Sequence, residues 1–186
     1  PERVIVVLDE AYFEYVEESH YPNGVERLQK YPNLVVTRTF SKIHGLAGLR
    51  IGWAYGPESV IDAIHRVRGP FNTTSVAQAA AVAALGDDAF VTGSVEHNNS
   101  ELDRVDPALQ NLGFKVYPSV GNFLLIEFED REGRRAADAD AFLRARGIVI
   151  RDMNAYGLPK CLRLSIGTKE ANDDVLAAFE AFAKAG

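Results

Sequence analysis

The chain has 186 residues, of which 47% are hydrophobic and 25% charged, as is typical of a globular protein with a buried core. Its net charge of −6 argues against nucleic acid or an anionic membrane as a partner. The sequence contains no run of about 18 apolar residues, the length that a helix needs to cross a bilayer. A single cysteine excludes a disulfide framework, and with four histidines it makes a metal site unlikely, so we expect no metal and a reducing, cytoplasmic location.

The first predicted element is a strand over residues 4–8, a continuous apolar run that ends at Asp9 and Glu10. Such a run is typical of a parallel strand that is buried on both faces. The chain has no initial methionine and no signal-peptide layout before this strand. We therefore expect Pro1 to be a cut point within a longer chain.

Two further strands are predicted over residues 34–38 and 51–55, and a helix follows Pro57. An alanine-rich segment, residues 74–85, predicts a buried helix. Residues 87–112 are also predicted to be helical, with a break or kink near Pro107. Together these last two segments could connect two domains.

The pattern changes after Gly113. Strands are predicted over residues 114–117, 123–128, 148–150 and 162–166, a helix over residues 135–146, and a last helix from Thr168. We interpret the whole as an α/β protein. Residues 1–104 form the C-terminal part of a large domain with a mostly parallel sheet, and residues 105–186 form a small α+β domain.

The most informative segment surrounds Lys42, which comes just after a predicted buried strand. Burial disfavours the charged form of a lysine and makes its amine a better nucleophile. Thr39 and Ser41 supply hydroxyls before it, and Arg50 supplies a cation after it. A lysine surrounded by hydroxyls and an arginine suits a phosphorylated aldehyde, because the amine can condense with the carbonyl while the other groups hold the phosphate.

Asp9 and Tyr12 form a second candidate group. Asp9 follows the first strand, and open α/β sheets bind ligands at the carboxyl ends of their strands. We expect Asp9 to be a buried carboxylate that needs a cationic partner, which a pyridinium nitrogen would provide. Tyr12 could then donate a hydrogen bond to a phenolic oxygen on the same ring.

These motifs resemble those of the fold-type I aminotransferases, which depend on pyridoxal 5'-phosphate, in a form most similar to histidinol-phosphate aminotransferase. The resemblance covers nearly the whole chain, in order. It is carried by Asp9-Glu-Ala-Tyr12, Thr39-Phe-Ser-Lys42, Gly45-Leu-Ala-Gly-Leu-Arg50, Pro70-Phe-Asn72, Gly121-Asn122-Phe123, Ile150-Arg151-Asp152 and Leu162-Arg-Leu-Ser-Ile-Gly-Thr168.

The resemblance implies a role for each matched residue. Lys42 would carry the cofactor as a Schiff base and then move a proton during catalysis. Asp9 and Tyr12 would contact the ring nitrogen and the ring hydroxyl. The cofactor phosphate would be held by Ser41, Arg50 and Thr39, and the anionic end of the substrate by Arg163 with help from Arg151.

Several of these residues also have a simpler structural explanation, and Lys42 by itself could be a surface lysine. Asp9 could cap a turn, Thr39 could satisfy backbone groups, and Arg50 could be a solvated loop residue. Arg163 lies inside an apolar strand, where an unpaired charge is costly, so it predicts an anion site or else a structural ion pair. Arg151 could instead pair with Asp152. The only cysteine, Cys161, is expected to be a packed thiol rather than a nucleophile.

The resemblance implies transfer of an amino group between histidinol phosphate and 2-oxoglutarate or glutamate in histidine biosynthesis, by a cytoplasmic homodimer. Alternatives are an aromatic or broad-specificity aminotransferase, a decarboxylase of phosphorylated substrates, a non-catalytic aminotransferase-like module, or a fragment with no function of its own. Members of this family are about twice as long, and their N-terminal half contributes to the cofactor site. If the molecule ends at Pro1, we expect weak or no cofactor binding and no turnover.

Overall fold

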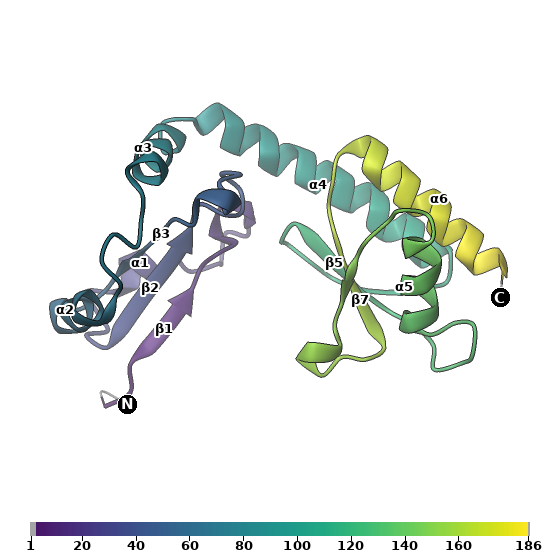
Figure 1. Ribbon diagram of the computed structural model, residues 1–186, viewed down its shortest axis with the longest axis horizontal. Coiled ribbons are helices and arrows are strands. Elements are labelled where there is room, and N and C mark those ends of the chain that lie inside the picture. Colours follow the sequence, from purple (N-terminus) through teal and green to yellow (C-terminus); the bar gives the residue numbers. More distant parts are fainter. Residues whose placement is uncertain (1–2, 186) are drawn as a thin grey trace. The chain divides into compact units, whose positions relative to one another are not determined.

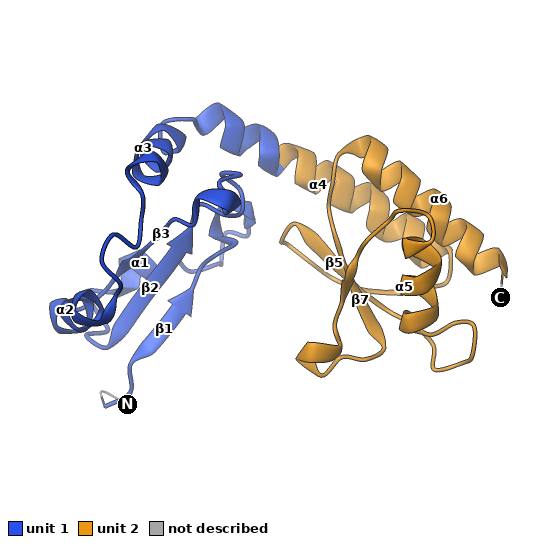
Figure 2. Ribbon diagram, in the orientation of Figure 1, with its two compact units in different colours: residues 1–95 blue, residues 96–186 orange. Residues whose placement is uncertain are grey.

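The structure is a computed structural model that describes residues 3–185 (Figure 1). The chain divides into two compact units, residues 1–95 and 96–186, coloured separately in Figure 2. The unit boundary falls within helix α4 (Asp88–Asn111). The domain boundary predicted between residues 104 and 105 lies further along the same helix and stays a prediction. Pro1, the expected cut point, lies outside the described residues.

The first unit is built on a three-stranded mixed sheet in the order β1-β2-β3. β1 (Val6–Asp9) pairs parallel with β2 (Leu34–Thr39), and β3 (Gly52–Tyr55) pairs antiparallel with β2. β2 therefore occupies the centre, and its residues Leu34, Val35 and Val36 are buried. The helices of this unit are α1 (Gly24–Arg27), α2 (Glu58–Val67), α3 (Ser75–Ala84) and the first part of α4, with short 3₁₀ turns at Phe13–Tyr15 and Ala47–Leu49.

The predicted strands and helices of this unit are present, but two predictions about burial are wrong. Residues 4–8 were expected to be buried on both faces, whereas Val7 is 60% exposed, because β1 is an edge strand of the described sheet. The alanine-rich helix α3 buries only Ala77 and Ala81, and Val82 is 73% exposed. The apolar pattern therefore identifies surfaces that no described part of this chain covers.

The second unit is an α+β structure around a four-stranded antiparallel sheet in the order β4-β5-β7-β6. Its strands are β4 (Lys115–Tyr117), β5 (Phe123–Glu127), β6 (Arg151–Asp152) and β7 (Cys161–Ser165). Its helices are the second part of α4, α5 (Ala136–Arg144) and α6 (Lys169–Ala185), with a 3₁₀ turn at Asn154–Tyr156. The strand predicted over residues 148–150 is wrong, because the short strand in this region begins at Arg151.

The core of the second unit packs the inner residues of the sheet against helices α4, α5 and α6. Phe179 of α6 is fully buried, and its ring lies 5.2 Å from that of Phe114 and 6.3 Å from that of Phe128. α4 continues through Pro107 without a break, and the alternative prediction of a kink there stays a prediction. Among the described residues, no helix is both long and apolar enough to span a membrane.

A buried polar cluster joins α4 to the start of α6. Asn172 donates to the Glu101 carboxylate at 2.7 Å and accepts from the backbone N–H of Gly167 at 3.0 Å. Arg104 forms an ion pair with Glu101 at 2.6 Å and a second one with Asp173, also at 2.6 Å. Each buried polar group in this cluster thus has a partner, as a low-polarity interior requires.

Candidate functional site

Lys42 lies in the loop that follows the carboxyl end of β2, and its side chain is partly buried. Its Nζ lies 5.0 Å from the centroid of the Tyr12 ring. Its backbone carbonyl accepts a hydrogen bond from Gly45, which has a φ of +68° that favours glycine. The structure therefore brings together two of the residues that the sequence singled out, from segments 30 residues apart in numbering.

The parallel pairing of β1 with β2 explains why these segments meet. Asp9 is in register with Thr37, and the backbone N–H of Glu10 donates to the Thr37 carbonyl at 2.9 Å. The chain leaves both strands at the same edge of the sheet, so the Asp9–Tyr12 segment and the Lys42 loop emerge side by side. This is the edge at which open α/β sheets bind ligands.

The environment of Asp9 differs from the prediction. We expected a buried carboxylate, but Asp9 is exposed, and its Oδ1 accepts a hydrogen bond from the backbone N–H of Ala11 at 3.1 Å. The turn-capping role is thus present, whereas a contact with a cofactor ring stays a prediction. The buried carboxylate is the next residue, Glu10, because successive side chains of a strand point to opposite faces.

The three residues predicted to hold a phosphate are linked in the structure. The guanidinium Nη1 of Arg50 lies 3.4 Å from the Ser41 hydroxyl and donates to the Ala47 carbonyl at 2.8 Å. Thr39 Oγ1 accepts from the backbone N–H of Ser41 at 3.1 Å and lies 3.5 Å from the Ile51 carbonyl. Thr39 therefore satisfies backbone groups, while Ser41 and Arg50 form a pair of donors beside Lys42.

Arg50 has an unusual backbone conformation, with a φ of +52° in the left-handed region. This conformation costs a non-glycine residue about 1 kcal/mol or more, and such outliers cluster at ligand-binding positions. Here it ends the Ala47–Leu49 turn and directs the guanidinium back toward Ser41. Because a glycine would adopt this backbone at less cost, the arginine side chain itself is the feature that requires an explanation.

Glu10 and Arg38 form a buried ion pair that the sequence analysis missed. The Glu10 side chain is fully buried, and its Oε2 lies 2.8 Å from Nη2 of Arg38 and accepts from Nε at 2.9 Å. Its Oε1 accepts from the backbone N–H of Gly24 at 2.7 Å. The sequence contains a signal for this pair. Arg38 lies in the apolar run 34–38, and two adjacent acids end the preceding predicted strand.

Arg151 and Arg163 occupy the second unit and are partners across the antiparallel pair β6–β7. Arg151 is exposed and donates to the Tyr156 hydroxyl at 3.1 Å. Nε of Arg163 is buried and has no hydrogen-bond partner among residues 3–185, and its guanidinium carbon lies 5.1 Å from the centroid of the Phe123 ring. Both arginines line a cavity of about 630 Å³.

The structural ion pairs proposed as alternatives for these arginines are not observed within residues 3–185. The carboxylate of Asp152 accepts from the backbone N–H of Asn154 at 3.0 Å, and this hydrogen bond holds the pKa of Asp152 below its usual range. Asp152 thus caps a turn rather than neutralising Arg151. Two cations side by side, one with a buried N–H that no described residue contacts, are suited to an anion.

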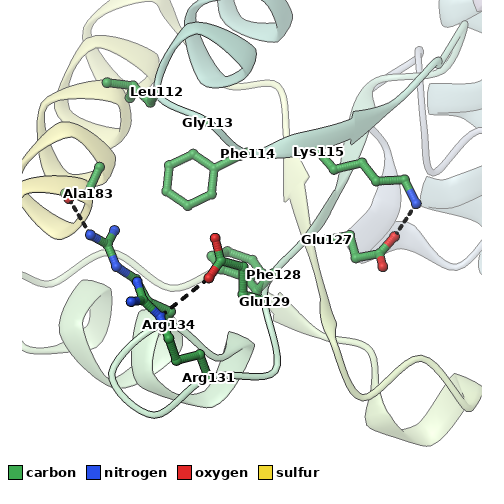
Figure 3. Close-up of a pocket in the computed structure, with 10 residues that line it drawn as sticks. All are labelled: Leu112, Gly113, Phe114, Lys115, Glu127, Phe128, Glu129, Arg131, Arg134 and Ala183. Carbon is green, nitrogen blue, oxygen red and sulfur yellow. Dashed lines mark hydrogen bonds and ion pairs between the residues drawn. The ribbon is translucent and has the colours of Figure 1, made fainter. Parts of the chain in front are cut away.

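A second pocket in this unit, shown in Figure 3, contains none of the predicted site residues. There Lys115 pairs with Glu127 at 2.7 Å, and Arg134 donates to the Ala183 carbonyl at 2.8 Å. Cys161 is buried, and burial raises the pKa of its thiol, which confirms that it is a packed residue. In the part of the chain that the structure describes, no three histidine, cysteine, aspartate or glutamate residues are grouped to hold a metal ion.

Comparisons with known proteins agree with this arrangement. The family model for aminotransferase class I and II matches residues 1–179. A histidinol-phosphate aminotransferase from Rhodopseudomonas palustris strain BisA53 is 52% identical over 182 residues, which are 98% of this chain and 50% of that protein. The chain thus spans about half the length of the curated relatives it matches.

Two solved structures show the same fold. The histidinol-phosphate aminotransferase of Sinorhizobium meliloti, in complex with pyridoxal-5'-phosphate, matches with a TM-score of 0.89 and 30% identity over 100% of this chain and 50% of that one. The L-threonine-O-3-phosphate decarboxylase of Porphyromonas gingivalis matches with a TM-score of 0.84 and 24% identity over 98% of this chain and 56% of that one. At that identity the second likeness shows the fold alone, and the predicted α/β fold of the fold-type I aminotransferases is confirmed.

Proposed function

Because this chain belongs to the aminotransferase class I and II family, we propose that the protein is a pyridoxal 5'-phosphate-dependent aminotransferase. It transfers an amino group between histidinol phosphate and 2-oxoglutarate or glutamate. The relatives that are 52% identical bear the name of this activity, and the related Sinorhizobium meliloti structure contains the cofactor. The observation that carries the proposal is the pairing of Ser41 with Arg50 directly beside Lys42.

The residues at the carboxyl edge of β1 and β2 fit a phosphorylated pyridine aldehyde. Ser41 and Arg50 offer a hydroxyl and a guanidinium to the phosphate, and Arg50 keeps a strained backbone that directs its side chain to Ser41. Lys42 offers an amine to the aldehyde from the adjacent position. Thr39 supports this loop by accepting the backbone N–H of Ser41.

Asp9 and Tyr12 complete the proposed site from the neighbouring segment. The Asp9 carboxylate is held by the N–H of Ala11 and would keep a ring nitrogen protonated. Tyr12, whose ring lies beneath the Lys42 amine, would donate its hydroxyl proton toward the phenolic oxygen. When bound, pyridoxal phosphate supplies an electron sink for charge that develops at the α-carbon of the substrate.

Lys42 has a second role in this proposal. With the cofactor bound, its Nζ would act as a general base that takes the proton from the α-carbon of the substrate and passes it to the carbon that derives from the cofactor aldehyde. Lys42 is partly buried beside the Tyr12 ring, a position that would limit the access of water to this amine. Such restricted access limits unproductive proton exchange with solvent.

Arg163 and Arg151 are the proposed substrate-binding groups. A guanidinium can donate two parallel hydrogen bonds to a carboxylate or a phosphate, so one site can accept both glutamate and histidinol phosphate. The buried Nε of Arg163, which lacks a partner among the described residues, gives such an anion a ready donor. Arg151, opposite it in the sheet, adds a second positive charge.

The assembly and location follow the family resemblance. We propose a cytoplasmic homodimer that acts in histidine biosynthesis, with small molecules as its substrates. Sedimentation analysis of a protein that is as long as the relatives tests whether it forms a dimer. A monomer under assay conditions would contradict the proposed assembly.

The cofactor assignment is tested with two proteins: the 186-residue chain, and the same chain joined to the N-terminal half of the Rhodopseudomonas palustris relative. Each is mixed with pyridoxal phosphate and reduced with borohydride, and peptide mass spectrometry locates the pyridoxyl group. We expect labelling at Lys42 in the joined protein and little in the short chain. Lys42→Ala should abolish it, whereas Lys30→Ala, which removes another lysine lying over a tyrosine ring, should not. Labelling spread over many lysines contradicts the proposal.

The substrate is tested separately. The joined protein is assayed with histidinol phosphate, phenylalanine and aspartate as donors and 2-oxoglutarate as acceptor. We expect histidinol phosphate to give the highest kcat/KM. If another donor is better, the proposed substrate is wrong, while the cofactor assignment stands on the labelling result.

A further inference from the structure

Glu10 lies between two of the proposed cofactor-binding residues, Asp9 and Tyr12, yet it points into the protein. It is 1% exposed, and both of its carboxylate oxygens are occupied, Oε1 by the N–H of Gly24 and Oε2 by Arg38. A Cβ at position 24 would lie 2.7 Å from Oε1, so this close approach requires a glycine. Glu10 is therefore held in one orientation and has no contact to spare for a ligand.

Arg38 belongs to the other segment of the proposed site. It lies on β2 next to Thr39, and Lys42 follows in the same loop. Its guanidinium carbon lies 3.6 Å from the centroid of the Phe13 ring, and Phe13 is the neighbour of Tyr12. Arg38 also donates to the side-chain oxygen of Asn23 at 3.0 Å. The ion pair and this ring contact thus bind the Asp9–Phe13 segment to the strand that leads to Lys42.

The energetics of such a pair favour a positioning role over a stabilising one. Removing two charges from water is costly, and an apolar pair of similar size often stabilises a protein equally well. What an apolar pair lacks is direction, because each hydrogen bond of Glu10 and Arg38 fixes an angle as well as a distance. The relationship that needs fixing here is the one between Tyr12 and Lys42, whose amine lies 5.0 Å from the ring centroid.

We propose that Glu10 and Arg38 are positioning residues for Lys42: their buried ion pair fixes the segment that carries Asp9 and Tyr12 against the loop that carries Thr39, Ser41 and Lys42. The inference rests on the proposed function insofar as Lys42 is the residue that bonds the cofactor. Neither Glu10 nor Arg38 touches the cofactor in this proposal. They act through the placement of Tyr12 beside the Lys42 amine.

The test compares Glu10→Ala and Glu10→Gln with Val35→Ala. Val35 is a buried residue of β2 whose truncation should destabilise the same unit without touching the ion pair. The first readout needs no cofactor: in the 186-residue chain, nuclear Overhauser contacts are measured between the Lys42 side chain and the Tyr12 ring. We expect these contacts in the wild type and in Val35→Ala, weaker contacts in Glu10→Gln, and loss in Glu10→Ala.

The second readout is the rate at which pyridoxal phosphate and borohydride label Lys42 in the joined protein, divided by the folded fraction. A misplacement of about 1 Å can slow a reaction about 100-fold. The labelling rate of Glu10→Ala should therefore fall by about that factor, while Val35→Ala should keep the wild-type rate. Equal losses in Glu10→Ala and Val35→Ala would show that the pair only stabilises the fold, and overturn the proposal.

Two further outcomes are informative. If Glu10→Ala does not fold, Glu10→Gln decides both readouts, because its amide keeps an acceptor for Gly24 and loses the charge that pairs with Arg38. Unchanged contacts in that variant overturn the positioning role. If the wild-type protein takes no label at Lys42, the proposed function fails, whereas the cofactor-free contacts still decide whether the ion pair positions Tyr12.

Discussion

Arg151 and Arg163 lie directly opposite each other on neighbouring antiparallel strands, with no carboxylate paired to either within the described residues. Like charges in directly opposite positions of a sheet repel each other. Such an arrangement has a cost in stability, and the anion of the proposed function would remove that cost. We therefore expect the stability of the second unit to depend on anion binding.

This link can be measured with Arg151→Ala. Without an anion, the variant should gain roughly 0.5 kcal/mol in the free energy of unfolding, because the repulsion is relieved. Inorganic phosphate should stabilise the wild type more than the variant, because binding to the folded state adds to stability. Urea unfolding with and without phosphate checks both effects. The control is Arg146→Ala, which removes a surface arginine that lies over Phe142 and should leave the effect of phosphate unchanged. If phosphate stabilises the wild type, Arg151→Ala and Arg146→Ala equally, the anion site is contradicted.

Arg50→Lys should weaken cofactor binding in the joined protein. Lysine keeps the positive charge but offers a single point of contact instead of a planar fork, and the loss of a charged hydrogen bond is worth about 1.5–3 kcal/mol, or roughly tenfold to 100-fold in affinity. Titration with pyridoxal phosphate, followed by absorbance, gives the dissociation constant. An unchanged constant would show that Arg50 makes no direct contact with the phosphate.

Glu101 should make the stability of the second unit depend on acid pH. Hydrogen bonding from Arg104, and then from Asn172, lowers the pKa of Glu101 from its usual value of 4.5. A carboxylate whose pKa is lowered by folding contributes stability that is fully present above the unfolded-state pKa and is lost as the pH falls through the lower, folded-state value. The difference in free energy of unfolding between wild type and Glu101→Gln should therefore be largest near neutral pH and shrink below about pH 4.5. Urea unfolding over this range is the measurement, and a difference that does not change with pH would contradict the assignment.

Gly52→Ala, at the start of β3, should destabilise the first unit, whereas Gly48→Ala, in the Ala47–Leu49 turn before it, should not. A Cβ at position 52 would lie 2.6 Å from the carbonyl oxygen of Arg38, a backbone atom of the central strand that cannot move aside easily. A Cβ at position 48 would have no atom of the described residues within 4 Å beyond its chain neighbours. We expect a loss of about 1–3 kcal/mol for Gly52→Ala from this overpacking, and a neutral or slightly stabilising effect for Gly48→Ala. Equal midpoints of chemical denaturation for the two variants would show that β3 can shift away from β2.

Much of the secondary structure could be predicted from the sequence because the apolar periodicity differs clearly between strands and helices. Periodicity identifies an apolar face but not what covers it. The predicted burial of residues 4–8 and of α3 is therefore wrong, although the strand and the helix are both present. The strand assigned to residues 148–150 failed for a related reason. Three β-branched residues favour a strand, but a partner strand decides where pairing begins, and β7 pairs with Arg151 and Asp152.

The sequence singled out residues that the structure brings together, but it did not predict their geometry. Arg50 lies beside Ser41, and Lys42, the next residue, lies over the Tyr12 ring, while their roles in a cofactor site stay a prediction. Asp9 and Glu10 are adjacent acids, and sequence alone does not say which of them faces the interior. That choice depends on how β1 pairs with β2, in which Asp9 lies opposite Thr37, and this pairing joins segments far apart in the sequence.

The buried state of Cys161 has a practical consequence for experiments on this protein. It is the chain's only cysteine, and the raised pKa of its thiol keeps it protonated and slow to react with maleimides at neutral pH. A cysteine introduced at an exposed position such as Glu132 would then be a unique attachment point for a fluorophore. Ligand titrations followed by a single dye therefore require no prior removal of native thiols.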